Sequence, residues 1–94
     1  MTLSIIIVSY NVSDYLRQCL SAIYDSTIID QTEIIVIDND SFDNSVNMIS
    51  KEFPEVKLKV NIENSGFSHA VNQGVAMSTG NLICLLNPDS IIKS

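Results

Sequence analysis

The chain has 94 residues, of which 46% are hydrophobic, and it carries a formal net charge of −6 with a sequence pI near 4.3. This length supports one domain with one core. The negative charge excludes a nucleic-acid partner, because phosphate backbones require clustered Lys and Arg, and the five basic residues of the chain form no run. No stretch reaches the length of a transmembrane helix, and the apolar N-terminus lacks the basic region that precedes a secretory signal.

The first half of the chain alternates a strand, a helix and a strand. The apolar run LSIIIVS at residues 3–9 predicts a buried strand. An amphipathic helix is predicted to follow as far as Tyr24, with Ser13 as its N-cap and Asp14 in its first turn, because apolar residues recur there on one face. Residues 33–38, with the sequence EIIVID, predict the second strand.

The same alternation continues in the second half. The spacing of apolar residues predicts a helix over residues 42–53 with Ser41 as its N-cap. Residues 57–62, with the sequence KLKVNI, alternate between polar and apolar and predict an edge strand. A third helix is predicted from near Gly66, with Gly80 as its stop, and its stripe of small residues predicts close packing on the sheet.

The last apolar run, LICLL at residues 82–86, stops abruptly at Asn87, Pro88 and Asp89. Proline fixes its own φ and keeps the preceding residue out of the helical region, so this turn presents Asp89 at the tip of a strand. Taken alone, Asn-Pro-Asp is also ordinary surface-turn sequence. Polar clusters follow the other strands in the same way, and this repetition favours a functional site at the strand ends.

The element order βαβαβαβ predicts an α/β fold with an open, doubly wound parallel sheet, because strands that alternate with helices are joined by right-handed crossovers. A strand order of 3-2-1-4 places the alternating third strand at an edge and reverses the winding direction between strands 1 and 4. Ligands bind outside the carboxyl ends of the strands at such a switch point. The polar residues after strands 1, 2 and 4 would then meet in one crevice, namely Tyr10, Asn11, Asp38, Asn39 and Asn87 to Asp89.

The fourth strand has the composition of an interior strand, yet only residues 90–94 follow its turn. We therefore expect the chain to be part of a longer protein. An unpaired strand edge is a template for further pairing. We expect this edge either to form a homodimer or to be covered by other residues.

The other reactive side chains show no metal or redox pattern. Cys19 and Cys84 lie in apolar contexts without CxxC spacing, which predicts buried free thiols in a reducing compartment. His69, the only histidine, is interpreted as a surface or packing residue. The chain lacks the GxGxxG and GxxxxGK patterns of nucleotide-binding loops. A receiver-like phosphotransfer domain would use acidic residues such as Asp38 and Asp40, but its phospho-acceptor Asp and later Lys have no convincing counterpart.

Four motifs follow one another along nearly the whole chain: IIIVSYN, IIVIDNDSFDNS, NSGFSHAVNQG and LICLLNPD. In this order and spacing they resemble the amino-terminal half of inverting family 2 glycosyltransferases with the GT-A fold. The NPD form resembles the rhamnosyltransferase-like branch, which builds bacterial surface polysaccharides. The resemblance implies that residues 1–94 are the nucleotide-sugar-binding half of a GT-A domain, without its acceptor-binding half.

The resemblance implies roles for the residues that follow strands 1 and 2. Val8, Ser9 and Tyr10 match the segment that holds the base, and Tyr10 would stack on a pyrimidine. The structural alternative for Tyr10 is to cap the edge of the sheet. Asp38 and Asn39 match an acidic pair that reads the base imide and the nearby sugar, and the amide of Asn39 suits this edge because it both donates and accepts.

The later motifs are matched in the same way. Asn64, Gly66 and Asn72 match elements that shape the wall of the donor pocket, where a glycine lets the backbone approach the ligand closely. Asn87 and Asp89 match the two ends of the family's Asp-x-Asp signature, with Asp89 as the ligand of Mg²⁺ or Mn²⁺ and Asn87 toward the ribose or the metal's water shell. An Asn in place of the first Asp removes one anionic ligand, so the strictness of the metal dependence stays open.

The implied reaction transfers a sugar from a UDP-, dTDP- or GDP-linked donor to a glycan or lipid-linked acceptor, with inversion at the anomeric carbon. The family's general base is an Asp or Glu well downstream of the Asp-x-Asp turn. We therefore expect the 94 residues to bind nucleotide weakly without turnover, within a cytoplasmic protein whose membrane association is left open. The alternative is a non-catalytic α/β nucleotide-binding or assembly module that kept the fold and lost the chemistry.

Overall fold

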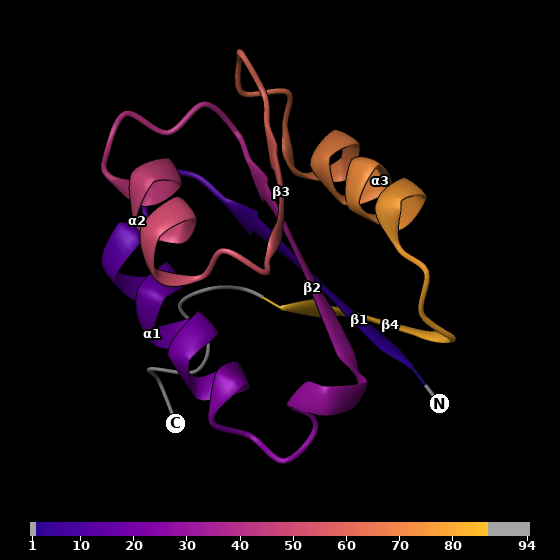
Figure 1. Ribbon diagram of the computed structural model, residues 1–94. Helices are drawn as coiled ribbons and strands as arrows, with labels where there is room; N and C mark the ends of the chain where they lie inside the picture. The colour runs from indigo at the N-terminus through magenta and orange to yellow at the C-terminus, as the bar shows by residue number, and fades with distance from the viewer. Residues whose placement is uncertain (1, 87–94) are drawn as a thin grey trace.

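The computed structural model describes residues 2–86, which form one four-stranded parallel sheet in the order β3-β2-β1-β4 (Figure 1). The predicted α/β class and the predicted strand order are confirmed. The elements in chain order are β1 (Leu3–Ser9), α1 (Ser13–Tyr24), a short 3-10 helix (Ile29–Gln31), β2 (Thr32–Asp38), α2 (Ser45–Glu52), β3 (Lys57–Val60), α3 (Phe67–Met77) and β4 (Leu82–Leu86).

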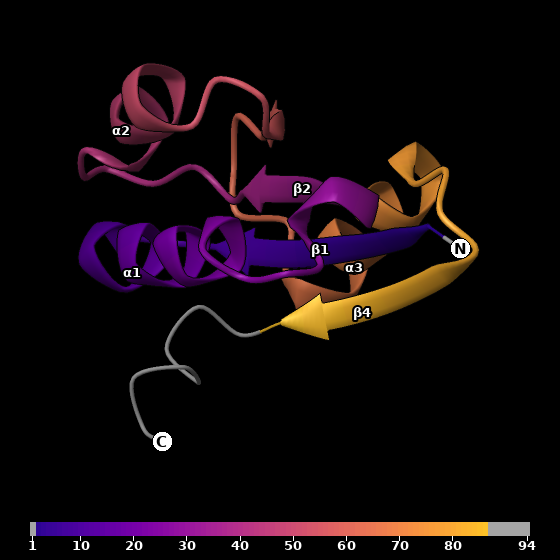
Figure 2. The ribbon, with the colours of Figure 1, turned by 60° about the horizontal axis from the view of Figure 1, so that its bottom comes forward.

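The two faces of the sheet are covered by different helices. Successive side chains of a strand point to opposite faces, so Ile5 and Ile7 of β1 pack in the cluster with α1 and α2, whereas Ile6 packs with Ala70 of α3. Figures 1 and 2 show α1 and α2 together on one side of the strands and α3 on the other. Because β1 and β2 are covered on both faces, they carry the nearly continuous apolar runs that the sequence shows.

The third helix lies very close to the sheet. A Cβ atom added at Gly74 would stand 2.5 Å from Cγ2 of Ile6, which no packed core allows. This contact confirms the close packing that the small residues predict. The buried stripe is nevertheless narrower than predicted, because only Ala70 and Gly74 of α3 are buried, while Phe67 and Val75 remain 64% and 42% exposed.

The fourth strand is less covered than its composition suggests. Within residues 2–86, β4 pairs only with β1, and Leu82, Ile83 and Leu85 are about half exposed. The prediction that Cys84 is buried is wrong, because Cys84 is exposed on a strand that pairs on one side only within residues 2–86. The prediction for Cys19 is confirmed, and burial raises the pKa of its thiol to about 11.

Three predicted helix ends are displaced. Ser13 is the first residue of α1, with Val12 in the N-cap position, and Ser41 lies four residues before the start of α2 at Ser45. Neither serine is in the N-cap position, and the Asp43 carboxylate instead accepts from the first N–H of each helix. The third helix ends at Met77, before the predicted stop. No helix between residues 2 and 86 is long and apolar enough to cross a membrane.

Candidate functional site

The carboxyl ends of β1, β2 and β3 lie side by side at one end of the sheet. Ser9 pairs with Asp38, and Asp38 pairs with Val60. Backbone hydrogen bonds extend the ladder by one residue, since the Asn39 N–H donates to the Ser9 carbonyl and the Asn61 N–H donates to the Asp38 carbonyl, both at 2.8 Å. The polar residues that follow these strands are therefore held at fixed positions by the sheet itself.

Asp38 is fully buried and organises the loops around it. Its carboxylate accepts hydrogen bonds from the backbone N–H of Ser41 at 2.9 Å and from the Ser41 hydroxyl at 2.7 Å. The same hydroxyl accepts from the Asn11 N–H at 2.9 Å, and the Asn11 side chain accepts from the Phe42 N–H at 2.6 Å. Asp38 thus couples the loop after β1 to the loop after β2, and both of its oxygens are already engaged by Ser41.

Two residues in these loops have left-handed backbone conformations. Asn11 has a φ of 52° and Asp40 has a φ of 66°. Asn and Asp tolerate this region better than other non-glycine residues. The chain therefore turns sharply after β1 and after β2, and these turns bring the two loops into contact.

Asn39 is also buried, with 2% of its surface exposed. Its Nδ2 donates to the carbonyl of Gly66 at 3.2 Å, and its Oδ1 accepts from Asn61 at 2.8 Å and from Ser65 at 3.3 Å. Asn61 also exchanges two hydrogen bonds with the amide of Gln73, at 2.8 and 2.9 Å. Asn39 therefore ties the end of β2 to the start of α3.

Asn61 and Gln73 are absent from the sites that the sequence predicts. Asn61 is the first polar residue after β3, in the same position relative to its strand as Asn39 is to β2. This equivalent position could have been used to predict Asn61 as a site residue from the sequence. Gln73 lies inside the NQG element of α3, between two matched motif positions, and nothing in its spacing distinguishes it from a solvent-facing helix residue.

The end of β1 carries an unsatisfied polar atom. Ser9 is fully buried, and its Oγ is the single buried side-chain nitrogen or oxygen without a hydrogen-bond partner among residues 2–86. Tyr10, the next residue, is 42% exposed and meets the ring of Phe42 edge-on at a centroid distance of 6.3 Å. Val8 is half-buried against the cluster under α3. The buried Ser9 hydroxyl, which has no hydrogen-bond partner among residues 2–86, is thus adjacent in the sequence to the exposed ring of Tyr10.

The residues predicted for the pocket wall lie near the start of α3. The Asn64 side chain accepts from the Gly66 N–H at 2.9 Å, and Gly66 has a φ of 88° just before the helix. A Cβ at Gly66 would meet no atom within 4 Å, so the backbone conformation, rather than crowding, requires glycine there. Asn72 is exposed on α3. Asn87 and Asp89 lie outside the described residues.

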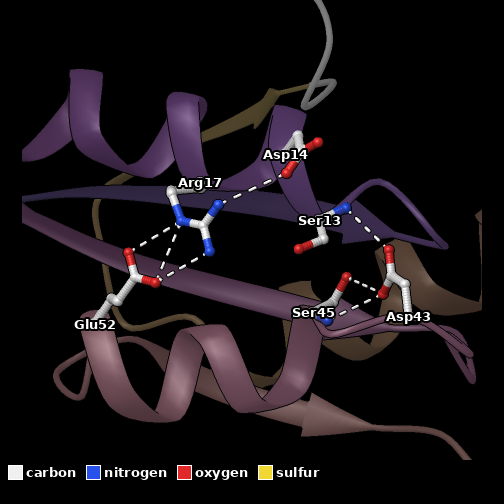
Figure 3. A network of polar contacts seen from close by, with 6 residues as sticks. All are labelled: Ser13, Asp14, Arg17, Asp43, Ser45 and Glu52. Atoms are coloured by element: carbon white, nitrogen blue, oxygen red, sulfur yellow. Dashed lines mark hydrogen bonds and ion pairs between the residues drawn. The ribbon is translucent and has the colours of Figure 1, made fainter.

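Asp43 joins the starts of α1 and α2 (Figure 3). Its carboxylate accepts from the Ser13 N–H at 3.0 Å, from the Ser45 N–H at 3.0 Å and from the Ser45 hydroxyl at 2.5 Å. Burial raises the pKa of this carboxyl, but the hydrogen bonds from Ser45 and Ser13 outweigh that effect, so the pKa lies below its ordinary value. A pocket of about 380 Å³ opens beside these residues at the start of α1.

Two of the four Lys and Arg side chains in residues 2–86, Arg17 and Lys57, form ion pairs. Arg17 of α1 forms a two-point ion pair with Glu52 of α2 and also approaches Asp14 (Figure 3), and Lys57 is paired with Glu33 at the opposite end of the sheet. No group of three His, Cys, Asp or Glu side chains that could hold a metal ion occurs in residues 2–86.

These features define a class. A doubly wound parallel sheet, with its winding reversed between β1 and β4 and with polar loops at the carboxyl ends of its strands, is the architecture of a Rossmann-like ligand-binding domain. The chain belongs to glycosyl transferase family 2, whose model matches residues 4–94. The family resemblance that the four motifs carry is thereby confirmed, while the rhamnosyltransferase-like branch stays a prediction.

Relatives and solved structures agree with this assignment. Glycosyltransferase GlyA of Streptococcus pneumoniae is 36% identical over 94 residues, which cover 97% of this chain and 13% of GlyA. The prophage-derived glycosyltransferase SunS of Bacillus subtilis is 33% identical over 85 residues, which cover 90% of this chain and 19% of SunS. The mannosyltransferase PcManGT from Pyrobaculum calidifontis, solved with GDP-Man and Mn²⁺, superposes with a TM-score of 0.78 at 25% identity, over 93% of this chain and 27% of PcManGT. The chain thus spans less than a third of each of these proteins.

Proposed function

We propose that this chain is the donor-binding part of a glycosyltransferase and that it binds a UDP-, dTDP- or GDP-linked sugar at the carboxyl ends of β1, β2 and β4. The observation that carries the proposal is the pairing of a buried, unpartnered Ser9 hydroxyl with the exposed ring of Tyr10, at the switch point of a family 2 domain. The GDP-Man bound to PcManGT supports a nucleotide sugar as the ligand class.

Each site residue has a role consistent with its surroundings. Tyr10 offers an aromatic face on which the base stacks. Ser9 is fully buried and its hydroxyl has no partner among residues 2–86, so in this proposal the loop after β1 opens to let the nucleotide bond that hydroxyl. Asp38 and Asn39 are too engaged with neighbouring residues to serve as freely exposed side chains. Their part is to hold the loops and the backbone groups against which the base and ribose lie.

The wall of the pocket and the diphosphate complete the proposed site. Asn64 and Gly66 shape the loop before α3, and Asn72 borders the donor from α3. In this proposal Asn87 and Asp89 would lie beside the diphosphate, and Asp89 would hold Mg²⁺ or Mn²⁺. The ion would supply positive charge next to the diphosphate, which a chain of net charge −6 does not offer in its side chains. The Mn²⁺ bound to PcManGT supports this choice of ion.

The whole protein, in this proposal, is a hexosyltransferase of the rhamnosyltransferase-like branch. It acts in the cytoplasm with inversion, on a glycan or lipid-linked acceptor, in the synthesis of a bacterial surface polysaccharide. The 94 residues alone do not turn over, because none of them is matched to the general base of the family. The half-exposed β4 edge provides a surface for a homodimer; sedimentation that stays monomeric at high concentration would refute this last point.

Calorimetry tests the donor site directly. UDP, dTDP and GDP are titrated into the wild-type chain with and without Mn²⁺, and the tightest nucleotide is then titrated into Asp89→Ala and into Asp25→Ala, a matched removal of an exposed carboxylate at the end of α1. We expect Mn²⁺ to strengthen binding, Asp89→Ala to abolish that gain and Asp25→Ala to preserve it. Equal binding by both variants would contradict the metal site.

A second candidate function remains for the case in which no nucleotide binds. The four-stranded sheet, with its half-exposed β4, would also serve a non-catalytic assembly module. Absence of binding by all three nucleotides, in the presence and absence of Mn²⁺, would favour this function over the donor site.

A further inference from the structure

Three side-chain amides form a continuous chain across the carboxyl end of the sheet. Gln73 and Asn61 exchange two hydrogen bonds, at 2.9 Å from Gln73 to Asn61 and at 2.8 Å in return. The Asn61 amide then donates to Asn39 at 2.8 Å, and the Asn39 amide donates to the carbonyl of Gly66 at 3.2 Å. This series of hydrogen-bonded amides, called the amide chain below, connects α3, the end of β3, the end of β2 and the loop that enters α3.

This amide chain determines what Asn39 presents to its surroundings. A carboxamide oxygen has two acceptor sites, and both are filled in Asn39, by Asn61 and by the Ser65 hydroxyl. One of its two N–H groups is given to Gly66. Within residues 2–86 the second N–H of Asn39 has no hydrogen-bond partner, and the orientation of Asn39 depends on the Asn61 amide, which in turn is held by Gln73.

The position next to Gly66 explains why an amide suits residue 39. The Gly66 carbonyl accepts both the Asn39 amide and the Ala70 N–H, which is the first backbone hydrogen bond of α3. A carboxylate at position 39 would still accept from Asn61 and Ser65, but it would place an oxygen against the Gly66 carbonyl. An amide at position 39 thus matches the hydrogen bond to the Gly66 carbonyl in the loop before α3.

We propose that Asn61 and Gln73 are positioning residues of the donor site, acting through Asn39 and Gly66 without touching the ligand. The inference rests on the proposed donor-binding function. Without the Gln73 amide, Asn61 loses two of its side-chain hydrogen bonds and can rotate, so that Asn39 and the Gly66 loop lose their fixed placement. The ligand must then order Asn39 and the Gly66 loop when it binds, and this ordering lowers its affinity.

The test removes the amide at constant size. Gln73→Met keeps the length of the side chain, and Gln18→Met makes the same change at an exposed position of α1. Calorimetry with the tightest of UDP, dTDP and GDP, at a temperature where circular dichroism shows each variant fully folded, should give about a tenfold weaker affinity for Gln73→Met, as expected for one or two lost hydrogen bonds. The affinity of Gln18→Met should equal that of the wild type.

A third variant separates positioning from loss of stability. Gln73→Glu still accepts from Asn61 but can no longer donate to it, so it should recover part of the affinity lost in Gln73→Met. The side-chain amide signals of Asn39 and Asn61 in ¹H–¹⁵N spectra provide a readout that needs no ligand. They should exchange slowly with water in the wild type, and faster, at shifted positions, in Gln73→Met.

The possible outcomes are distinct. Shifted Asn39 signals together with weakened binding support the proposal. Shifted signals with unchanged affinity overturn it and leave the amide chain as a support of the fold only, and unshifted signals overturn the chain itself. If the wild type binds no nucleotide, the donor function fails and the positioning role fails with it, while the amide signals still report whether the chain of hydrogen bonds exists.

Discussion

The two ends of the parallel sheet use buried polar groups in opposite ways. At the amino end, the Glu33 carboxylate of β2 accepts from the Ser4 hydroxyl of β1 at 2.5 Å and from the Thr79 N–H before β4 at 2.6 Å, and it is paired with Lys57 of β3. One carboxylate therefore fastens the beginnings of all four strands. The Ser4 hydroxyl also accepts from the Gly80 N–H at 2.9 Å, so its hydrogen-bonding capacity is used.

At the carboxyl end the groups are neutral or lack a cation. Among residues 2–86, the side chain of Asp38 is bonded by Ser41, the three amides bond one another, and the Ser9 hydroxyl has no partner. The amino end is saturated by charge-assisted contacts and holds the sheet together. At the carboxyl end one buried hydroxyl stays without a partner within residues 2–86. The two ends therefore differ in how fully their buried polar groups are bonded, and the donor site is proposed at the less fully bonded end.

Removal of the Glu33 charge should have the largest effect on stability. Burial raises the pKa of this carboxyl, but hydrogen bonds from Lys57, Ser4 and Thr79 outweigh burial and lower the pKa from 4.5 to about 2. Glu33→Gln should therefore reduce the free energy of unfolding by about 2–3 kcal/mol at neutral pH, since Lys57 is half exposed and screened by solvent. Urea denaturation gives the value.

The pH dependence follows from the direction of that shift. A carboxyl whose pKa is lower in the folded state stabilises the protein above its ordinary pKa, and this stabilisation is lost as the pH falls from about 4.5 toward about 2. The difference in stability between the wild type and Glu33→Gln should shrink across that window. A difference that is constant with pH would show that the amino end is not held by the charge of Glu33.

Glycine-to-alanine substitutions at the two ends should reduce the free energy of unfolding by different amounts, and both losses should be smaller than that of Glu33→Gln. A Cβ at Gly80 would stand 2.5 Å from the Ser4 hydroxyl and 2.9 Å from the Ser4 backbone nitrogen, so Gly80→Ala must displace the start of β4 at a cost of about 2 kcal/mol. At the carboxyl end, Gly66→Ala meets no atom and should cost about 1 kcal/mol through its positive φ alone. Equal losses in urea denaturation would mean that the amino end is as open as the carboxyl end.

The sequence allowed the sheet to be predicted because its signals are local. Apolar runs, their alternation with helices and the polar residues after each strand are all read from neighbouring letters, and they led to the order β3-β2-β1-β4. The resemblance of the four motifs to a known family suggested a nucleotide sugar as the ligand. The predicted cap of α1 was wrong because the first N–H of that helix donates to Asp43, which is 30 residues away from Ser13 in the sequence. A single-residue capping rule cannot see a partner so distant.

The amide chain and the exposure of β4 escaped prediction for a related reason. Asn61 and Gln73 meet Asn39 only when the register of β2 on β3 and the rotation of α3 are both fixed. Such contacts are properties of the assembled fold. Cys84 has an apolar neighbourhood in the sequence, yet its burial depends on which elements pack over β4, and no neighbouring letter specifies that.

The smallest effect on stability, and the sharpest comparison, comes from two serines of the same strand. Ser4 and Ser9 both lie in β1 and both are fully buried. Ser4→Ala removes a hydroxyl that donates to Glu33 and accepts from Gly80, and it should cost about 1–2 kcal/mol. Ser9→Ala removes a hydroxyl without a partner, and it should leave the free energy of unfolding unchanged or slightly higher.

Ligand binding should reverse this ranking. Ser4 lies at the end of the sheet away from the proposed donor, so Ser4→Ala should bind nucleotide as the wild type does once it is folded. Ser9→Ala should bind it several-fold more weakly, because the hydroxyl is held in reserve for the ligand at the cost of one unsatisfied buried group. If Ser9→Ala instead lost stability and kept its affinity, the hydroxyl would have a structural partner, and the carboxyl end would be as saturated as the amino end.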